Sequence, residues 1–98
     1  MSDFLARLAE IIEERKRNPR RDSYTNQLLS DPARAAQKVG EEASEVIVAA
    51  LAQTDVRLVE EMADLTYHSL VLLAAHDLSW SDVVAELERR HAPRQGEG

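Results

Sequence analysis

Apolar residues recur at helical spacing through most of the chain. The first apolar stripe consists of Phe4, Leu5, Leu8, Ile11 and Ile12. Intervals of three and four residues place these side chains on one face of a helix, and Ser2-Asp3 supplies a start signal. The helix is predicted to end near Asn18-Pro19, because proline disfavours helical geometry in the residue before it.

A polar connection is predicted from residue 18 to residue 31, with one helical turn over residues 26–29. Asp31 followed by Pro32 is typical of a helix start, since aspartate caps the first N–H groups and proline fits the first helical position. The second helix is predicted to run from there to about Gln53.

Thr54-Asp55 caps the predicted third helix, which continues to about His76. Ser79 with Asp82 resembles a capping box at the start of a fourth helix over residues 80–91. No segment alternates apolar and polar residues over a useful length, so strands are not expected. The fold class is therefore predicted to be all-α, a four-to-five-helix chain with an antiparallel central helix pair.

The inner halves of the two central helices are apolar nearly all round, with VIVAALA in one and LVLLAA in the other. A helix of a small monomer exposes one face, so these segments require a second covering layer. The first and last helices can supply part of it, and a homodimer that completes a four-helix-bundle core would supply the rest. Residues 1–91 are predicted to form a single domain and residues 92–98 a disordered tail.

Composition narrows the classes of protein. The chain has 98 residues, enough for one core, and its formal charge of −6 argues against a nucleic-acid partner. The absence of cysteine excludes disulfides, thiolate metal sites and a cysteine nucleophile. No apolar run approaches the roughly 20 residues of a bilayer span, and no signal peptide is recognisable. A cytoplasmic protein without a membrane partner is expected.

Each central helix carries two acidic residues on the stripe that should face the core. These residues are Glu42 and Glu45 in one helix and Glu61 and Asp64 in the other. The short turn between the helices makes them antiparallel neighbours, and the heights of the two pairs then differ by only about 4 to 5 Å. We therefore expect four carboxylates to converge, although each pair taken alone would suit a solvated helix face.

Converging carboxylates repel one another and lose solvation, which a hard divalent cation would relieve. Mg²⁺ takes oxygen ligands and keeps waters and substrate phosphates in its shell, and Mn²⁺ is the alternative. The chain has no cysteine and no His-x-x-His spacing, which disfavours zinc.

The acidic pattern resembles that of the all-α nucleotide pyrophosphohydrolase superfamily, which includes the MazG-type enzymes and the dimeric dUTPases. Within it, the sequence is most similar to the phosphoribosyl-ATP pyrophosphohydrolase family, over roughly residues 4–91. The segments that carry this finer resemblance are SYT at 23–25, KVGEEA at 38–43 and DLTYH at 64–68.

The resemblance implies Mg²⁺-dependent hydrolysis of phosphoribosyl-ATP to phosphoribosyl-AMP and pyrophosphate, the second step of L-histidine biosynthesis. It assigns Glu42, Glu45, Glu61 and Asp64 as catalytic metal ligands. Glu41 is either a fifth, outer ligand or a solvent-facing residue, because it lies about 100° around the helix from Glu42.

Candidate substrate-binding residues lie around the acidic pattern. They are Lys38, Arg20, Arg21, Ser23, Tyr24 and Thr25. Lys38 could neutralise a phosphate or be an ordinary surface lysine, and the arginine cluster could hold the extra ribose phosphate or be solvated surface. His68 is expected either to orient a ligand carboxylate by a hydrogen bond or to satisfy the core.

Two other functions remain open on the residues alone. A housecleaning pyrophosphohydrolase of noncanonical nucleoside triphosphates would share the carboxylates and differ in the substrate segment. A helical interaction module with an acidic face would bind a basic partner and turn over nothing.

Overall fold

The computed structural model describes residues 4–92, and this part of the chain contains five helices and no strand. The helices are α1 (Phe4–Arg17), α2 (Tyr24–Leu29), α3 (Pro32–Ala52), α4 (Asp55–Ala75) and α5 (Trp80–His91). The predicted all-α class is confirmed. The start signal at Ser2-Asp3 and residues 93–98 of the predicted tail lie outside the described residues.

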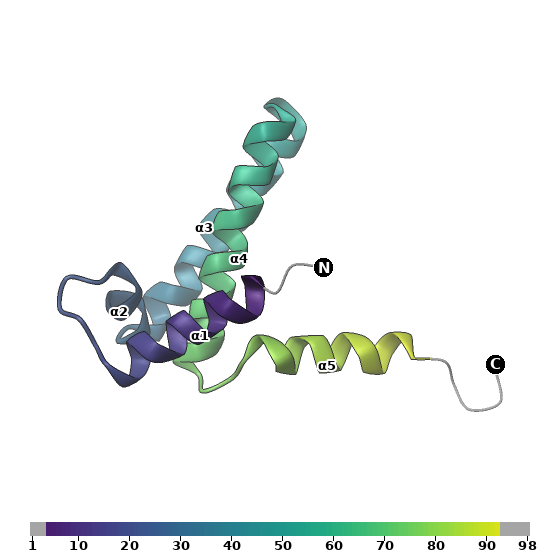
Figure 1. The fold of residues 1–98 in the computed structure, drawn as a ribbon. Helices are drawn as coiled ribbons and strands as arrows, with labels where there is room; N and C mark the ends of the chain where they lie inside the picture. Colours follow the sequence, from purple (N-terminus) through teal and green to yellow (C-terminus); the bar gives the residue numbers. More distant parts are fainter. Residues whose placement is uncertain (1–3, 93–98) are drawn as a thin grey trace.

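The two longest helices, α3 and α4, form an antiparallel hairpin that projects from the rest of the chain (Figure 1). Asp31 caps α3 by accepting a hydrogen bond from the Arg34 N–H, and Pro32 is its first residue. Thr54 Oγ1 caps α4 by accepting from the Arg57 N–H at 3.2 Å. Both start signals read from the sequence are confirmed, and so is the antiparallel central pair.

The extent of α2 differs from the prediction of one turn at residues 26–29. The helix begins at Tyr24, because Ser23 acts as its N-cap and Ser23 Oγ accepts a hydrogen bond from the Asn26 N–H at 3.2 Å. The prediction missed this start because so short a segment has little apolar periodicity to read. The one fully buried side chain of α2, Leu28, anchors it in the core.

The core lies at the base of the hairpin, where α1 and α2 pack against α4 (Figure 1). Its buried members are Ile12, Leu28, Ala35, Leu70, Val71 and Ala74. Trp80, the first residue of α5, packs against this cluster, while the rest of α5 extends away from it. The Ser79 N–H donates to the Asp82 carboxylate at 2.9 Å, so α5 begins where its capping pattern predicts.

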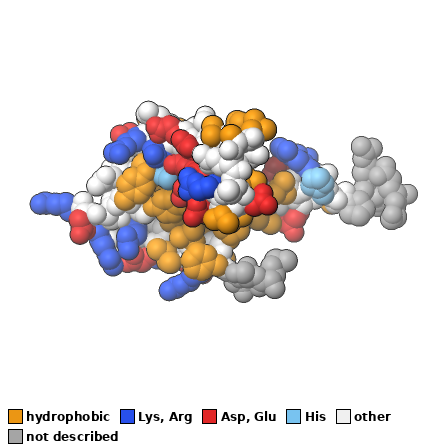
Figure 2. All heavy atoms as spheres, turned by 90° about the horizontal axis from the view of Figure 1, so that it is seen from above, with side chains coloured by type: hydrophobic (Ala, Val, Ile, Leu, Met, Phe, Trp, Pro, Cys, Tyr) orange, Lys and Arg blue, Asp and Glu red, His pale blue; other side chains and the backbone are white. Residues whose placement is uncertain are grey.

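The outer half of the hairpin exposes apolar side chains. Leu51 is 83% exposed, and Val56 and Val59 are also largely exposed. Seen from the direction of the hairpin tip, apolar and charged side chains share the same surface (Figure 2). Within residues 4–92, no helix combines the length and hydropathy that a bilayer span requires.

The end of α1 is tied to the end of α4 by Lys16. Its ammonium donates to the Ala74 carbonyl at 2.7 Å and pairs with the Asp77 carboxylate. Asp77 adopts a left-handed backbone conformation, with φ of 59°. The hydrogen bond and charge of Lys16 hold the pKa of Asp77 below its ordinary value.

We predict that Asp77→Asn lowers stability at neutral pH but not in acid. Asparagine tolerates the left-handed region, so the change removes mainly the charge. A carboxyl whose folded-state pKa is lowered stabilises the fold above its unfolded pKa and loses this effect as the pH falls through the folded value. Denaturant midpoints of the two proteins should therefore differ at pH 7, and the difference should shrink as the pH falls below about 4 and through the lowered pKa of Asp77. A difference that does not change over this pH range would contradict this.

Candidate functional site

Three carboxylates from the two central helices come together on the hairpin. Glu42 of α3 and Glu61 and Asp64 of α4 each place an oxygen within 4.8 Å of the others. Glu61 is only 6% exposed, Glu42 is partly buried and Asp64 is open to solvent. This carboxylate trio offers oxygen donors that suit a hard divalent cation, with access from the side of Asp64.

The other two acidic candidates stand apart from the trio. Glu45 lies one turn further along α3 and is exposed, and it is not among the carboxylates that converge. Glu41 is also exposed and pairs with Lys38 at 3.6 Å. The structure thus brings together three of the four predicted ligands.

Arg57, which sequence reasoning did not assign to the site, reaches the most buried carboxylate of the trio. One guanidinium nitrogen pairs with Glu61, and the other lies 2.6 Å from Glu60 Oε1. The spacing Arg-x-x-Glu-Glu carries the signal that could have found it, because residues three and four apart are neighbours on a helix surface.

Lys38 approaches the trio from α3. Its ammonium lies 3.8 Å from Glu42 and 3.6 Å from Glu41, and its side chain is mostly buried. A cation in this position can meet an anionic group that approaches the trio.

His68 lies one turn after Asp64 on α4 and is 6% exposed. Its Nδ1 is 2.8 Å from the Asp64 carbonyl oxygen, and its Nε2 is 2.9 Å from the Tyr24 hydroxyl. A carbonyl only accepts, so Nδ1 carries the proton, and in the neutral ring Nε2 accepts from Tyr24. The imidazole thus contacts the backbone of Asp64, not its carboxylate, and joins α2 to α4.

The predicted substrate segment divides into two parts. Ser23 caps α2 and accepts from Arg15 at 3.1 Å, while the Thr25 hydroxyl bonds the Tyr67 hydroxyl of α4. Like Tyr24, these side chains are engaged within the protein. Arg20 and Arg21 are exposed, and neither makes an ion pair within residues 4–92.

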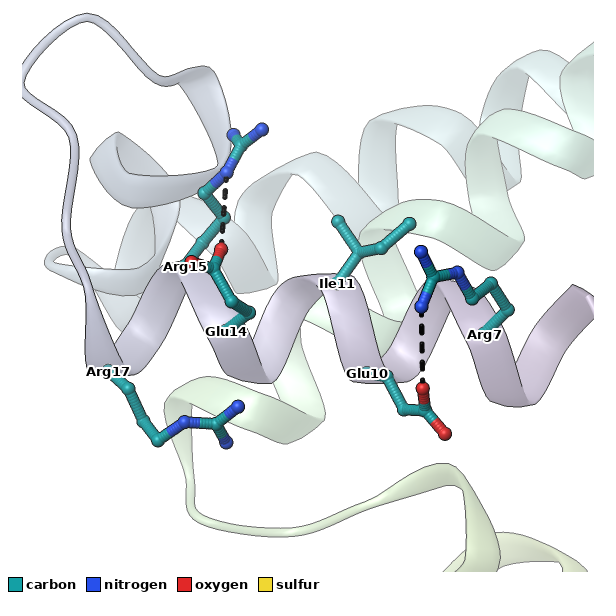
Figure 3. Close-up of a pocket in the computed structure, with 6 residues that line it drawn as sticks. All are labelled: Arg7, Glu10, Ile11, Glu14, Arg15 and Arg17. Atoms are coloured by element: carbon teal, nitrogen blue, oxygen red, sulfur yellow. Dashed lines mark ion pairs between the residues drawn. The ribbon is translucent and has the colours of Figure 1, made fainter.

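A separate hollow lies on the surface of α1 and does not touch the trio (Figure 3). Its lining residues are Arg7, Glu10, Ile11, Glu14, Arg15 and Arg17. The charges there are partly paired with each other, Arg7 with Glu10 at 3.7 Å and Arg15 with Glu14 at 3.8 Å. All six come from α1 alone and none of them belongs to the trio, so we assign the candidate site to the hairpin.

Fold and geometry define the class of protein: an all-α chain whose central hairpin gathers carboxylates suited to a divalent metal. The sequence profile of phosphoribosyl-ATP pyrophosphohydrolase (PRA-PH) matches residues 5–91. The chain belongs to the phosphoribosyl-ATP pyrophosphohydrolase family.

Individual relatives agree with this assignment. A protein of Pyrobaculum calidifontis named phosphoribosyl-ATP pyrophosphatase is 55% identical over 87 residues, which cover 88% of this chain and 93% of the relative. A Caulobacter vibrioides protein of the same name is 50% identical, over 92% of this chain and 84% of the relative. The histidine biosynthesis bifunctional protein HisIE of Buchnera aphidicola is 47% identical, over 90% of this chain but only 41% of that protein.

We predict that Glu42→Gln, Glu61→Gln and Asp64→Asn each weaken Mn²⁺ binding. Loss of one charged ligand should lower the affinity by about tenfold or more, measured from the electron paramagnetic resonance signal of free Mn²⁺. Glu88→Gln, on the exposed face of α5, serves as the control for loss of one negative charge. Wild-type affinity in two of the three trio variants would contradict the assignment.

Proposed function

We propose that this protein hydrolyses phosphoribosyl-ATP to phosphoribosyl-AMP and pyrophosphate, and that the carboxylate trio holds the divalent cation of the reaction. The observation that carries the proposal is the convergence of Glu42, Glu61 and Asp64 inside the segment matched to the family. The names of the relatives support the substrate, and the name of the Buchnera relative supports a place in histidine biosynthesis. We place this biosynthetic activity in the cytoplasm, with no nucleic-acid or membrane partner.

The donor set favours Mg²⁺, with Mn²⁺ as the alternative, because all three donors are carboxylate oxygens. A bound Mg²⁺ would polarise the diphosphate oxygens and lower the pKa of a bound water. Glu45 lies one turn from Glu42, and we propose that a change of its side-chain rotamer brings it to the cation as the fourth ligand. Glu41 is engaged with Lys38, so we assign it an outer position.

A carboxylate oxygen not engaged by the cation can take the proton of the attacking water. The water oxygen then bonds to the α-phosphorus while the bond to the bridging oxygen breaks, and pyrophosphate leaves. Lys38, beside Glu42, is placed to neutralise charge on the departing group.

Substrate selection needs groups that the trio does not supply, since every nucleoside triphosphate offers metal and polyphosphate. We assign the phosphate on the second ribose to Arg20 and Arg21, whose side chains are exposed and without ion-pair partners in the described part of the chain. Ser23, Tyr24 and Thr25 are bound to α1 and α4 by their own hydrogen bonds. We propose that they position the arginine-bearing segment beside the hairpin.

A homodimer is proposed from the outer half of the hairpin. Side chains such as Leu51, Val56 and Val59 expose apolar surface that a small monomer would bury. A twofold partner could lay the same surface of its own α3 and α4 against it and complete a four-helix bundle.

We predict that the purified protein releases pyrophosphate from phosphoribosyl-ATP with Mg²⁺ much faster than from any member of a nucleoside triphosphate panel. The double variant Arg20→Ala with Arg21→Ala should lower kcat/KM for phosphoribosyl-ATP by about ten- to a hundredfold, the value of one charge-assisted contact. Slow hydrolysis of ATP should be nearly unchanged. Equal losses on both substrates would mean that the arginines only attract anions, and faster use of another triphosphate would overturn the proposed substrate.

We predict that Leu51→Glu and Val59→Glu convert the dimer to a folded monomer. Both side chains are exposed in a single chain, so the new charge disturbs only the association. Leu72→Glu is a poorer test, because Leu72 packs against the core of its own chain. Sedimentation velocity at micromolar concentration gives the oligomeric state, with Gln37→Glu near the base of α3 as the control. A wild-type protein that sediments as a compact monomer would contradict the proposal.

A further inference from the structure

Arg57 bridges two neighbouring carboxylates of different exposure. Its Nη2 pairs with Glu61, whose side chain is 8% exposed, and its Nη1 pairs with Glu60, whose side chain is 54% exposed. The guanidinium itself is about half exposed. It therefore has one partner inside the carboxylate trio and one partner at the surface.

The helix dipole does not favour Arg57 at its position. It lies in the first turn of α4, where its N–H is capped by Thr54. A cation there opposes the helix dipole, which favours negative charge at this end. Arg57 is also the only basic residue between Glu41 and Asp64, a stretch with seven acidic residues. Its electrostatic partners are therefore the acidic residues of the site.

Lys38 shows the same arrangement on α3. It lies between Glu42, a member of the trio, and Glu41, an exposed neighbour. Each central helix thus carries a Glu-Glu doublet in which one carboxylate belongs to the trio and the other faces out. In both helices a single cation contacts both members of the doublet.

We propose that Arg57 is an internal counter-cation of the metal site. Its guanidinium pairs with Glu61 until a bound divalent cation displaces the guanidinium, which then pairs with Glu60 alone. The inference rests on the proposed metal site. A guanidinium and a metal ion beside one carboxylate repel each other, so Arg57 at Glu61 opposes the binding of a divalent cation there. Glu60 lets Arg57 withdraw without losing every charge-assisted bond. Arg57 is then a positioning residue that sets how readily the site takes up metal.

The test is the affinity of the full-length protein for Mn²⁺ alone, followed by electron paramagnetic resonance. Arg57→Gln should bind Mn²⁺ about tenfold more tightly than the wild type, because the competing charge is gone. Arg57→Lys should return the affinity towards the wild-type value. Glu60→Gln should weaken binding roughly threefold, since Arg57 then has only Glu61 to pair with.

A double-mutant comparison separates this role from general electrostatics. Loss of a surface charge at Glu60 would weaken cation binding in any background, but loss of the alternative partner matters only while Arg57 is present. Glu60→Gln should therefore weaken Mn²⁺ binding less in the Arg57→Gln protein than in the wild type, and only by as much as the loss of one surface charge does. Asp55→Asn, which removes another exposed charge in the first turn of α4, is the matched control and should act equally in both backgrounds.

Thermal unfolding gives a second readout that a purely structural role would not move. Arg57→Gln leaves the buried charge of Glu61 unpaired, so its Tm without metal should fall below that of the wild type. Saturating Mn²⁺ should raise the Tm of the variant by more than it raises that of the wild type. Equal rises would overturn the proposal.

The failure of this inference and the failure of the metal site give different results. If Arg57→Gln binds Mn²⁺ as the wild type does or more weakly, while Glu61→Gln loses binding, the metal site stands and the counter-cation role is wrong. If Glu61→Gln binds Mn²⁺ as tightly as the wild type, the counter-cation role is wrong, and if one other trio variant also binds as the wild type does, or the wild type does not bind Mn²⁺, both proposals are wrong.

Discussion

The structure depends on the balance of charge where α3 packs against α4. Glu42, Glu61 and Asp64 each place one carboxylate oxygen within 4.8 Å of the others. Burial of Glu61 removes the water that would stabilise its negative charge. Two cations offset this repulsion, Lys38 at Glu42 and Arg57 at Glu61. Each comes from the same helix as the carboxylate it pairs with. The hairpin therefore contains both the carboxylates that repel one another and the two cations that reduce this repulsion.

A second constraint joins the hairpin to the segment before it. The Tyr24 hydroxyl, the His68 ring and the Asp64 carbonyl form one chain of hydrogen bonds, and Thr25 adds a bond to Tyr67. Both contacts come from the first two residues of α2, which begins three residues after Arg21. These hydrogen bonds hold the segment that contains Arg20 and Arg21 at a fixed distance from the carboxylate trio. The proposed substrate segment and the proposed metal site are thereby linked through the backbone of α4.

Much of the fold could be predicted because its helix boundaries are set locally. Asp31-Pro32, Thr54 and Ser79 each cap the helix that follows them, so a few residues suffice to find the starts of α3, α4 and α5. The convergence of carboxylates was also predictable, since it follows from the length of the turn and the rise of a helix. The start of α2 was missed because its packing rests on one buried residue, Leu28, and not on a repeated pattern.

Details of the site could not be predicted from the sequence, because they depend on side-chain conformation. Glu42 and Glu45 share a helix face, yet only Glu42 joins the trio, and periodicity cannot choose between two rotamers. Arg57 is similar: its spacing from Glu60 and Glu61 fits an ordinary surface ion pair, and only the burial of Glu61 makes the contact part of the site.

The surface of α3 and α4 changes in character along the length of the hairpin. Their outer halves expose Leu51, Val56 and Val59, which favour an apolar partner, while the proposed metal site requires Asp64 to stay open to solvent. A partner that covered the whole hairpin would close the site, and one that covered none of it would leave the apolar surface in water. A proposed homodimer must therefore cover the tip side of the hairpin and stop short of Asp64. The edge of the apolar surface, close to Glu60 and Arg57, then becomes the rim of the site.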